Sequence, residues 1–183
     1  MKSQGDKIKD PLNFLLTTLH EFQLDTPPAR QLVQYFKEQD MILFNPPNVK
    51  GWDGGTAWLS SQKLLQRCGV VATIASGKSL DNFRFKPRQM EMADDMEMSE
   101  GAMFGKPRNE QKLPALKWNK SLTTNKLIIQ DLSERLVFNV SKDMQKDMEQ
   151  VLKYDFNPSE MNAQLAVTRL AEYIMKSPEY QLC

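Results

Sequence analysis

The residue types best suited to binding chemistry lie in one short stretch of the sequence, FNPPNVKGWDGGTAW. Asn48, Lys50 and Asp53 supply an amide, an ammonium group and a carboxylate close together in the chain. Trp52 and Trp58 add flat aromatic faces on which a sugar ring can stack. These five residues form the candidate ligand-binding set, in which polar contacts lie beside a stacking platform.

The backbone of this stretch, residues 44–58, is expected to have a specified shape. Pro46 and Pro47 stiffen its extended first part, and the glycines that follow permit positive φ or close backbone approach. Thr56 can cap the next helix, and the N-terminus of that helix favours an anion.

Two interpretations of the stretch remain open. In the first, it is a platform for a small ligand or a glycan, with Trp52 or Trp58 as the stacking surface. In the second, both tryptophans are anchors packed into the helices, and the glycines let the loop lie flat. Buried aromatic side chains usually determine packing before chemistry, so we expect at least one tryptophan to be buried against the first and third helices.

A second segment with chemical potential is MEMADDMEMSEGAM, which spans residues 90–103. Methionine thioethers are soft ligands that can hold Cu(I). However, no histidine or cysteine accompanies these methionines. We therefore expect a flexible segment that uses methionine for adaptable packing or is a solvated acidic loop, and we predict neither a metal site nor a cofactor.

Signals for catalysis are sparse. His20 is the only histidine, so a scheme of the Ser-His-Asp or Cys-His kind must use it, and it lies at the edge of an apolar helical stripe, as a surface residue does. Cys68 and Cys183 lack metal-ligand spacing. The chain also lacks a glycine-rich nucleotide loop and a nucleophile elbow, so the sequence leaves open whether the protein is an enzyme.

Apolar periodicity predicts helices on both sides of the stretch. The first covers about 11–24 and begins at Asp10-Pro11, and the second begins at Thr26-Pro27 and ends at about Gln39. A third helix follows the stretch, with Gly77 placed to cap its C-terminus. Its predicted apolar side consists of Leu64, Leu65, Cys68, Val71, Ala72 and Ala75.

The second half of the chain begins with a long irregular segment at about 78–121, predicted to be a connection or flap. Helices resume at Thr124 and again at Ser141, which is a candidate N-cap. The last long helix is predicted to begin at Asn157 within the sequence NPSE and to end at about Lys176, before one short turn.

Composition limits the possible classes of protein. The 183 residues suit a single helical domain, 1–183, of about six helices in a bundle-like array, which makes the fold class mainly α. Lys and Arg total 24 against 23 for Asp and Glu, so no strong positive field is available to hold nucleic acid. No apolar run is long enough for a membrane span or a signal peptide.

A longer stretch, LFNPPNVKGWDGGTAWLSSQKLLQR, resembles a signature near the C-terminal end of the bacterial domain-of-unknown-function 1800 family (DUF1800). The matching positions are Phe44, Pro46, Pro47, Asn48, Val49, Lys50, Gly51, Trp52, Gly54, Gly55 and Trp58. KDPLNFLLTTLHEF resembles the start of a helix in the family, and SPEYQ resembles its ending. Asp53 departs from the pattern, where a proline is common.

The resemblance implies a C-terminal piece of a longer, exported bacterial protein without an established activity. The partner is unknown: the resemblance implies an upstream domain of that protein as one candidate. Apolar surface left exposed without that domain makes self-association the other. We expect a binding or scaffolding region. The alternative is part of a hydrolase-like or glycan-binding enzyme, whose site is completed by an upstream region and lined by Asn48, Lys50 and Asp53.

Overall fold

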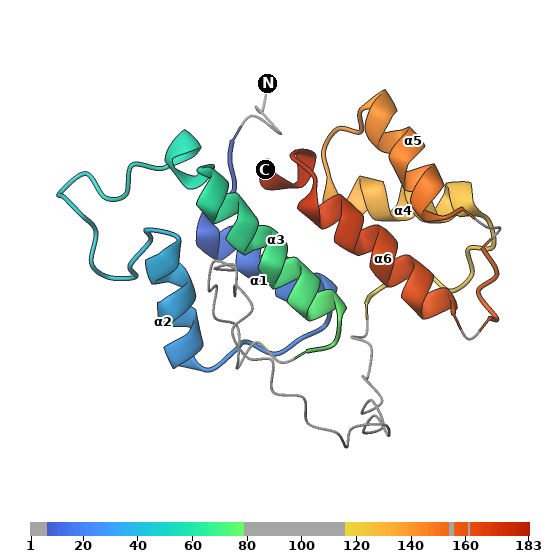
Figure 1. Ribbon diagram of the computed structural model, residues 1–183, viewed down its shortest axis with the longest axis horizontal. Coiled ribbons are helices and arrows are strands. Elements are labelled where there is room, and N and C mark those ends of the chain that lie inside the picture. Colours follow the sequence, from blue (N-terminus) through green and yellow to red (C-terminus); the bar gives the residue numbers. More distant parts are fainter. Residues whose placement is uncertain (1–6, 79–115, 154–155, 161) are drawn as a thin grey trace, which may run out of the picture.

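The computed structural model describes residues 7–78, 116–153, 156–160 and 162–183 (Figure 1). Within these ranges the chain forms helices and two isolated β-bridges, which confirms the mainly α class. The α-helices are α1 (Pro11–Glu21), α2 (Ala29–Glu38), α3 (Ser61–Ala75), α4 (Asn125–Leu136), α5 (Lys142–Val151) and α6 (Ala163–Lys176). Two short 3₁₀ helices are η1 (Gly55–Trp58) and η3 (Glu179–Gln181).

Several helix starts follow the predicted capping chemistry. The Asp10 carboxylate accepts a hydrogen bond from the N–H of Asn13 at 2.7 Å, with Pro11 as the first helical residue. The Ser141 hydroxyl likewise accepts from the N–H of Met144 at 3.1 Å at the start of α5. Ser60, and not Thr56 as predicted, is the N-cap of α3, because Thr56 lies within η1.

Two helices begin later than predicted. Helix α2 begins at Ala29 and not near Thr26, because Pro28 disfavours helical backbone at the residue before it. Helix α6 begins at Ala163 and not after Asn157. The Asn157 side chain instead accepts a hydrogen bond from the N–H of Ser159 at 3.1 Å, which closes a local turn.

Helices α1, α2 and α3 end in the same motif, in which a residue with positive φ reverses the chain. Gly77 has this role after α3, as predicted, with a φ of +69°. Gln23 has it after α1 and Asp40 after α2, with φ values of +50° and +55°. In each case the next residue donates back to the last turn, as Met41 does to the carbonyl of Phe36 at 2.8 Å. Helix α1 therefore ends three residues before the predicted position.

Helix α6 lies at the centre of the molecule and packs against α3, α4 and α5 (Figure 1). One hydrophobic core contains residues from both halves of the sequence. Its fully buried members include Phe14, Val71, Ile74, Ile128, Leu132, Met148, Val167, Leu170 and Ile174. The core joins the helices on either side of residues 79–115.

The first and last described residues also lie side by side. Ile8 and Leu182 form an antiparallel bridge, and Lys9 donates its backbone N–H to the carbonyl of Gln181 at 2.7 Å. The ring of Tyr180 in η3 packs edge-on against Phe14 of α1, with centroids 5.7 Å apart. The SPEYQ segment therefore docks onto the first helix.

The end of the predicted irregular segment also packs on the helices. Leu116 is buried, and Trp118 donates its indole N–H to the Gln164 side chain at 2.8 Å. The Trp118 ring contacts Phe156 edge-on at a centroid distance of 5.5 Å. Most of the predicted irregular segment, including the methionine-rich residues 90–103, lies outside the described residues.

Candidate functional site

The candidate binding stretch, residues 44–58, connects α2 to α3 and projects from the helices at one end of the molecule, coloured cyan in Figure 1. We call it the projecting loop. All five predicted site residues lie in it. Asn48, Lys50 and Asp53 are exposed, whereas Trp52 and Trp58 are half-buried.

Asn48 organises a tight turn in the projecting loop. Its side-chain oxygen accepts from the N–H of Lys50 at 2.8 Å, and its carbonyl accepts from the N–H of Gly51 at 3.0 Å. Gly51 has a φ of +93°, a conformation that L residues rarely adopt. The amide oxygen of Asn48 therefore serves the loop's own backbone, while the Lys50 side chain is exposed.

A second turn precedes η1. Gly54 and Gly55 have φ values of +67° and +56°, so both positions favour glycine. The Trp58 ring lies over Gly54, since a Cβ atom there would be 3.7 Å from its Cη2 atom. The predicted need for glycine in this loop is confirmed at these positions.

Both tryptophans depart from the predicted anchoring role, because neither is buried and η1 has no buried residue. The physical reason is that the loop projects from the helices and does not lie flat across them. The Trp52 indole nitrogen is shielded from solvent and has no hydrogen-bond partner within the described part of the chain. The described core is formed without either tryptophan.

The apolar side chains near the Asn48 turn are more exposed than the tryptophans. Phe44 and Val49 have 99% and 105% of the surface that an isolated residue would expose. Phe44 also has a φ of +64°, which is strained for a bulky side chain. The loop therefore presents apolar side chains to solvent from a backbone held by its own hydrogen bonds.

One lysine of α3 holds both ends of the projecting loop. The Lys63 ammonium donates to the Ala57 carbonyl at 2.7 Å and pairs with the Asp40 carboxylate at 2.7 Å. Asp40 lies just before the loop and Ala57 lies near its end. Lys63 is therefore a clamp across the base of the loop.

A polar cluster lies beneath this base and was missed by sequence reasoning. Arg67 of α3 is completely buried, at 0% exposure, and its Nε donates to the side-chain oxygen of Gln39 at 3.2 Å. Its Nη1 donates to the Gln181 side chain at 3.0 Å, and its Nη2 donates to the Lys9 carbonyl at 3.1 Å. We call Lys9, Gln39, Gln66, Arg67 and Gln181 the Arg67 cluster.

The charge of Arg67 is balanced by dipoles and an aromatic ring. The three acceptors of the guanidinium are neutral oxygens, and its Cζ lies 5.0 Å from the Phe14 ring centroid. Burial lowers the pKa of Arg67 from its ordinary value, although an arginine stays protonated in a protein. Gln39 completes the arrangement by donating to the Gln66 side chain at 2.7 Å.

Lys9 is a second buried cation in the cluster. Its ammonium lies 3.6 Å from the ring centroid of Tyr180, and burial lowers its pKa from 10.5 to about 8. The Tyr180 hydroxyl is in turn 3.2 Å from the hydroxyls of Thr17 and Thr18. The cluster thus fixes the start of α1, the end of α2 and the final turn relative to one another.

This arrangement corrects the predicted apolar side of the third helix. Val71 and Ala75 of the predicted side are buried, whereas Leu65 is exposed. The buried residues of α3 are Gln66, Arg67, Val70, Val71, Ile74 and Ala75. The predicted side was the more apolar one, so hydrophobic periodicity alone selects the wrong rotation. Distant partners, the side chains of Gln39 and Gln181 and the Lys9 carbonyl, satisfy Arg67 in the core.

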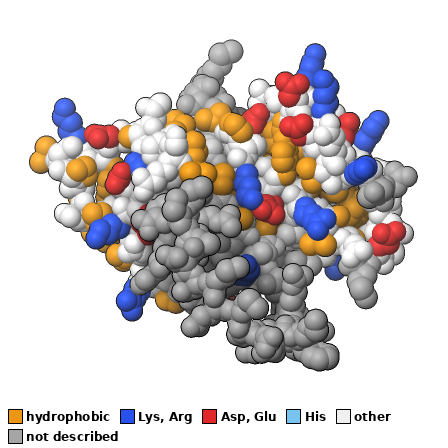
Figure 2. Space-filling view, viewed as in Figure 1, with side chains coloured by type: hydrophobic (Ala, Val, Ile, Leu, Met, Phe, Trp, Pro, Cys, Tyr) orange, Lys and Arg blue, Asp and Glu red, His pale blue; other side chains and the backbone are white. Residues whose placement is uncertain are grey.

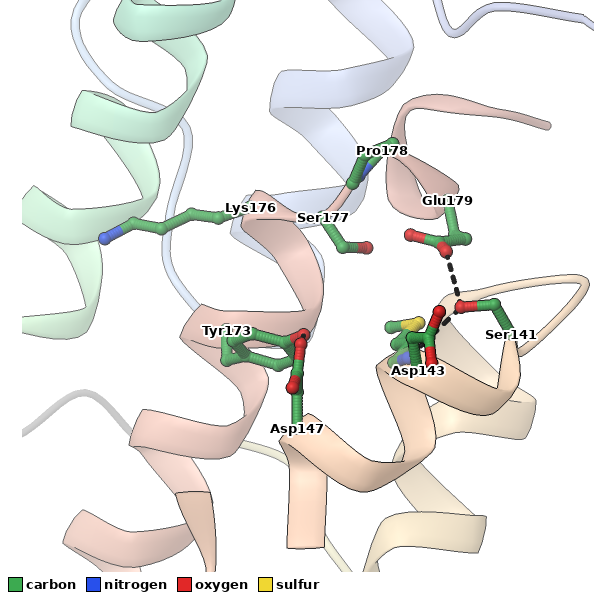
Figure 3. Close-up of a pocket in the computed structure, with 9 residues that line it drawn as sticks. Ser141, Asp143, Asp147, Tyr173, Lys176, Ser177, Pro178 and Glu179 are labelled. Carbon is green, nitrogen blue, oxygen red and sulfur yellow. Dashed lines mark hydrogen bonds between the residues drawn. The ribbon is translucent and has the colours of Figure 1, made fainter. Parts of the chain in front are cut away.

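An open pocket of about 400 Å³ lies between α5 and the end of α6 (Figure 3). Tyr173 donates to the Asp147 carboxylate at 2.9 Å, and Ser141 donates to Glu179 at 3.2 Å. Burial and the hydrogen bond to Asp147 raise the pKa of Tyr173 to about 12, so this phenol stays protonated. The lining residues include no histidine or cysteine, and Lys176 points away towards α3. These residues supply hydrogen-bond acceptors and donors but no activated nucleophile.

Other candidate chemistry is limited in the same way. His20 is exposed on α1 as predicted, with its nearest charge contact to Glu21 at 3.8 Å. In the described ranges, no group of three acidic, histidine or cysteine side chains is arranged to hold a metal ion. No helix of those ranges has the length and hydrophobicity needed to cross a membrane.

Comparison with known proteins gives one match. A family model described as "Protein of unknown function (DUF1800)" matches residues 1–182. No curated protein and no solved structure matches the chain significantly. The family match covers the projecting loop, the Arg67 cluster and the pocket together.

Proposed function

This chain belongs to the DUF1800 family, and from that premise we propose that it is a binding region whose contact element is the projecting loop. The family description gives its function as unknown, so the proposal depends on the loop itself. One observation supports it most: an ordered loop exposes Phe44 and Val49 completely. Large apolar side chains that a folded loop holds completely in solvent are candidates for an interaction site.

The backbone of the loop supports the same proposal. A positive φ at Phe44 costs roughly 1–3 kcal/mol, and such strain is often retained at functional positions. The side chain at Phe44 makes no core contact that would compensate for this cost, because it is fully exposed. We infer that its compensation comes from a partner.

The shape of the loop favours a large partner over a small ligand. Small-ligand sites are concave and bury most of the ligand, whereas this loop projects outward. The hydrolase-like alternative receives less support, because the Asn48 oxygen is engaged by the loop's own backbone. The half-buried tryptophans still permit stacking of a glycan, which is the ligand-binding form of the proposal.

The resemblance described above further implies that the protein is exported from a bacterial cell. We retain this as part of the proposal. Detection of the protein in a periplasmic or secreted fraction supports it, and retention in the cytosol contradicts it.

A photo-crosslinking experiment tests the contact role. A benzoyl-phenylalanine placed at Phe44 should form adducts in cells that express the protein. The same residue at Phe138 provides the control, because Phe138 is also exposed, at 57%, but follows α4. Adducts at position 44 and not at 138 support the proposal. Equal labelling at both positions, or labelling at neither, contradicts it.

A further inference from the structure

We propose that residues 44–51 of the projecting loop insert into the interface of a phospholipid bilayer. This inference rests on the proposed function and specifies its partner as a membrane surface. The inserted side chains would be Phe44 and Val49, the two most exposed apolar residues described. No membrane-spanning helix is required, and none is present in the described ranges.

The shape of the projecting loop suits a lipid surface better than a protein partner. A stable protein partner typically covers about 800 Å² on each side of an interface, which needs a broad complementary surface. Phe44 and Val49 instead belong to the projecting loop, at the end of the molecule where Figure 2 shows hydrophobic side chains exposed. A bilayer accepts a projecting apolar loop without a matching groove, so the shape favours lipid over protein.

The backbone of the loop is also suited to insertion. Polar backbone groups that enter an apolar medium need hydrogen bonds within the protein. Pro46 and Pro47 have no N–H to satisfy. The N–H of Asn45 donates to the Ile42 carbonyl at 3.1 Å. The next two N–H groups after Val49 both donate to Asn48. Most N–H groups of this segment are therefore absent or paired, which lowers the cost of leaving water.

The remaining side chains of the loop suit the headgroup region of a bilayer. Lys50 follows Val49 directly and carries an exposed ammonium group that can reach lipid phosphates while its methylenes stay in apolar surroundings. Trp52 and Trp58 follow and are half-buried, with part of each side chain open to solvent, as suits tryptophan in the headgroup region. Asp53 adds a negative charge, so the loop has no strong net charge.

This charge balance specifies the kind of binding. The whole chain carries a formal net charge of +1, so attraction to anionic lipid is weak and apolar insertion must dominate. Binding should therefore occur on neutral vesicles and change little with salt. A protein bound through basic patches would behave in the opposite way.

The test is flotation of the full chain with vesicles of pure phosphatidylcholine and of pure phosphatidylglycerol, at low and high salt. The parent should partition onto both, with a blue shift of tryptophan emission. Phe44→Ala should weaken partition by about tenfold and Val49→Asp by at least that, because each removes an inserted apolar group. Phe138→Ala should change it less than about twofold, since that side chain lies outside the loop. Circular dichroism and melting of every variant establish that they are folded.

Other outcomes overturn the inference in distinguishable ways. Absence of parent binding to both vesicles contradicts insertion, as does binding that needs phosphatidylglycerol and is lost at high salt. Equal losses for the Phe44 and Phe138 variants also contradict it. If vesicles fail but crosslinking from position 44 yields a protein adduct, the membrane partner is wrong and the proposed binding function stands. If both experiments fail, both proposals are wrong.

Discussion

The projecting loop exposes apolar side chains to water, whereas the Arg67 cluster buries charged and amide side chains in the core. Phe44 and Val49 are fully exposed, and Arg67 and Gln39 are fully buried. Each region reverses the usual distribution of residue types. The two regions are nevertheless neighbours, because Gln39 of the cluster directly precedes Asp40, which Lys63 binds at the base of the loop.

The structures of the two regions are specified in different ways. The loop is held by short-range bonds, such as those between Asn48 and its neighbours. The cluster is held by residues far apart in the sequence, since Arg67 links Lys9 to Gln181. The shape of the loop therefore depends on local sequence, while the cluster depends on the whole fold.

The largest expected effect comes from removing the second half of the chain. We propose that residues 1–77 and 122–183 form one cooperative unit, because a single core and the Arg67 cluster use both parts. A piece containing residues 1–80 should lose its cooperative unfolding transition, because α6 and Gln181 are missing. Denaturant unfolding and amide exchange measure this against the full chain. A monomeric 1–80 piece with unchanged amide protection would show instead two independent domains.

The next largest effect should come from Arg67→Met. The substitution keeps much of the side-chain volume but leaves the Gln39 and Gln181 oxygens without their donor. We expect a loss of about 3–5 kcal/mol in the free energy of unfolding. Arg169→Met, on the exposed side of α6, should change it by less than about 0.5 kcal/mol. Equal midpoints of urea unfolding for the two variants would show that the Arg67 cluster does not stabilise the fold.

Burial of Lys9 should have a smaller effect, a pH dependence of the free energy of unfolding. Burial lowers the pKa of Lys9 in the folded protein from 10.5 to about 8, so between these values the unfolded chain holds a proton that the folded chain lacks. The free energy of unfolding should therefore rise with pH from about 8 to 10, by about 2 kcal/mol from this group. Below pH 8 both states are protonated and the contribution is constant. Above pH 10 the buried Tyr35 and Tyr180, whose pKa values are raised, act in the opposite direction.

Variants isolate the Lys9 contribution from other titrating groups. The free energy of unfolding of the parent minus that of Lys9→Met should rise between about pH 8 and 10. Lys7→Met should retain the parent's dependence, because Lys7 is exposed. A parallel profile for the parent and Lys9→Met would mean that Lys9 is not buried as a cation.

The smallest stability effects are expected in the projecting loop. Trp52→Ala and Trp58→Ala should each cost less than about 1 kcal/mol, and Phe44→Ala less than about 0.5 kcal/mol, because none of these residues is buried. Phe14→Ala provides the contrast and should cost about 3–5 kcal/mol, because Phe14 is fully buried. Thermal unfolding measures all four. A large loss for either tryptophan variant would restore its role as an anchor.

Local chemistry accounts for the features that the sequence predicted well. Asp10, Ser141 and Gly77 each determine a helix end through their own backbone neighbours, and all three predictions are confirmed. The glycine requirement in the projecting loop is of the same kind. The candidate set from Asn48 to Trp58 was therefore placed correctly in a loop of specified shape, and its role in binding stays a prediction.

Several features that depend on distant residues were not predicted. The rotation of α3 follows from acceptors on Gln39 and Gln181, which hydrophobic periodicity within α3 does not contain. The end of α1 at Glu21 is followed by a positive φ at Gln23, a residue that carries no sequence signal for it. The sequence also carries no signal for the direction in which the loop projects. The tryptophans that we expected to be buried are therefore only half-buried.

The Lys63 clamp has a practical consequence for protein engineering. Since one α3 side chain binds both Asp40 and the Ala57 carbonyl, the two ends of the loop are anchored outside its central sequence. The residues between them can in principle be replaced by a foreign peptide of similar length while α2 and α3 keep their positions. The helices would then serve as a display scaffold.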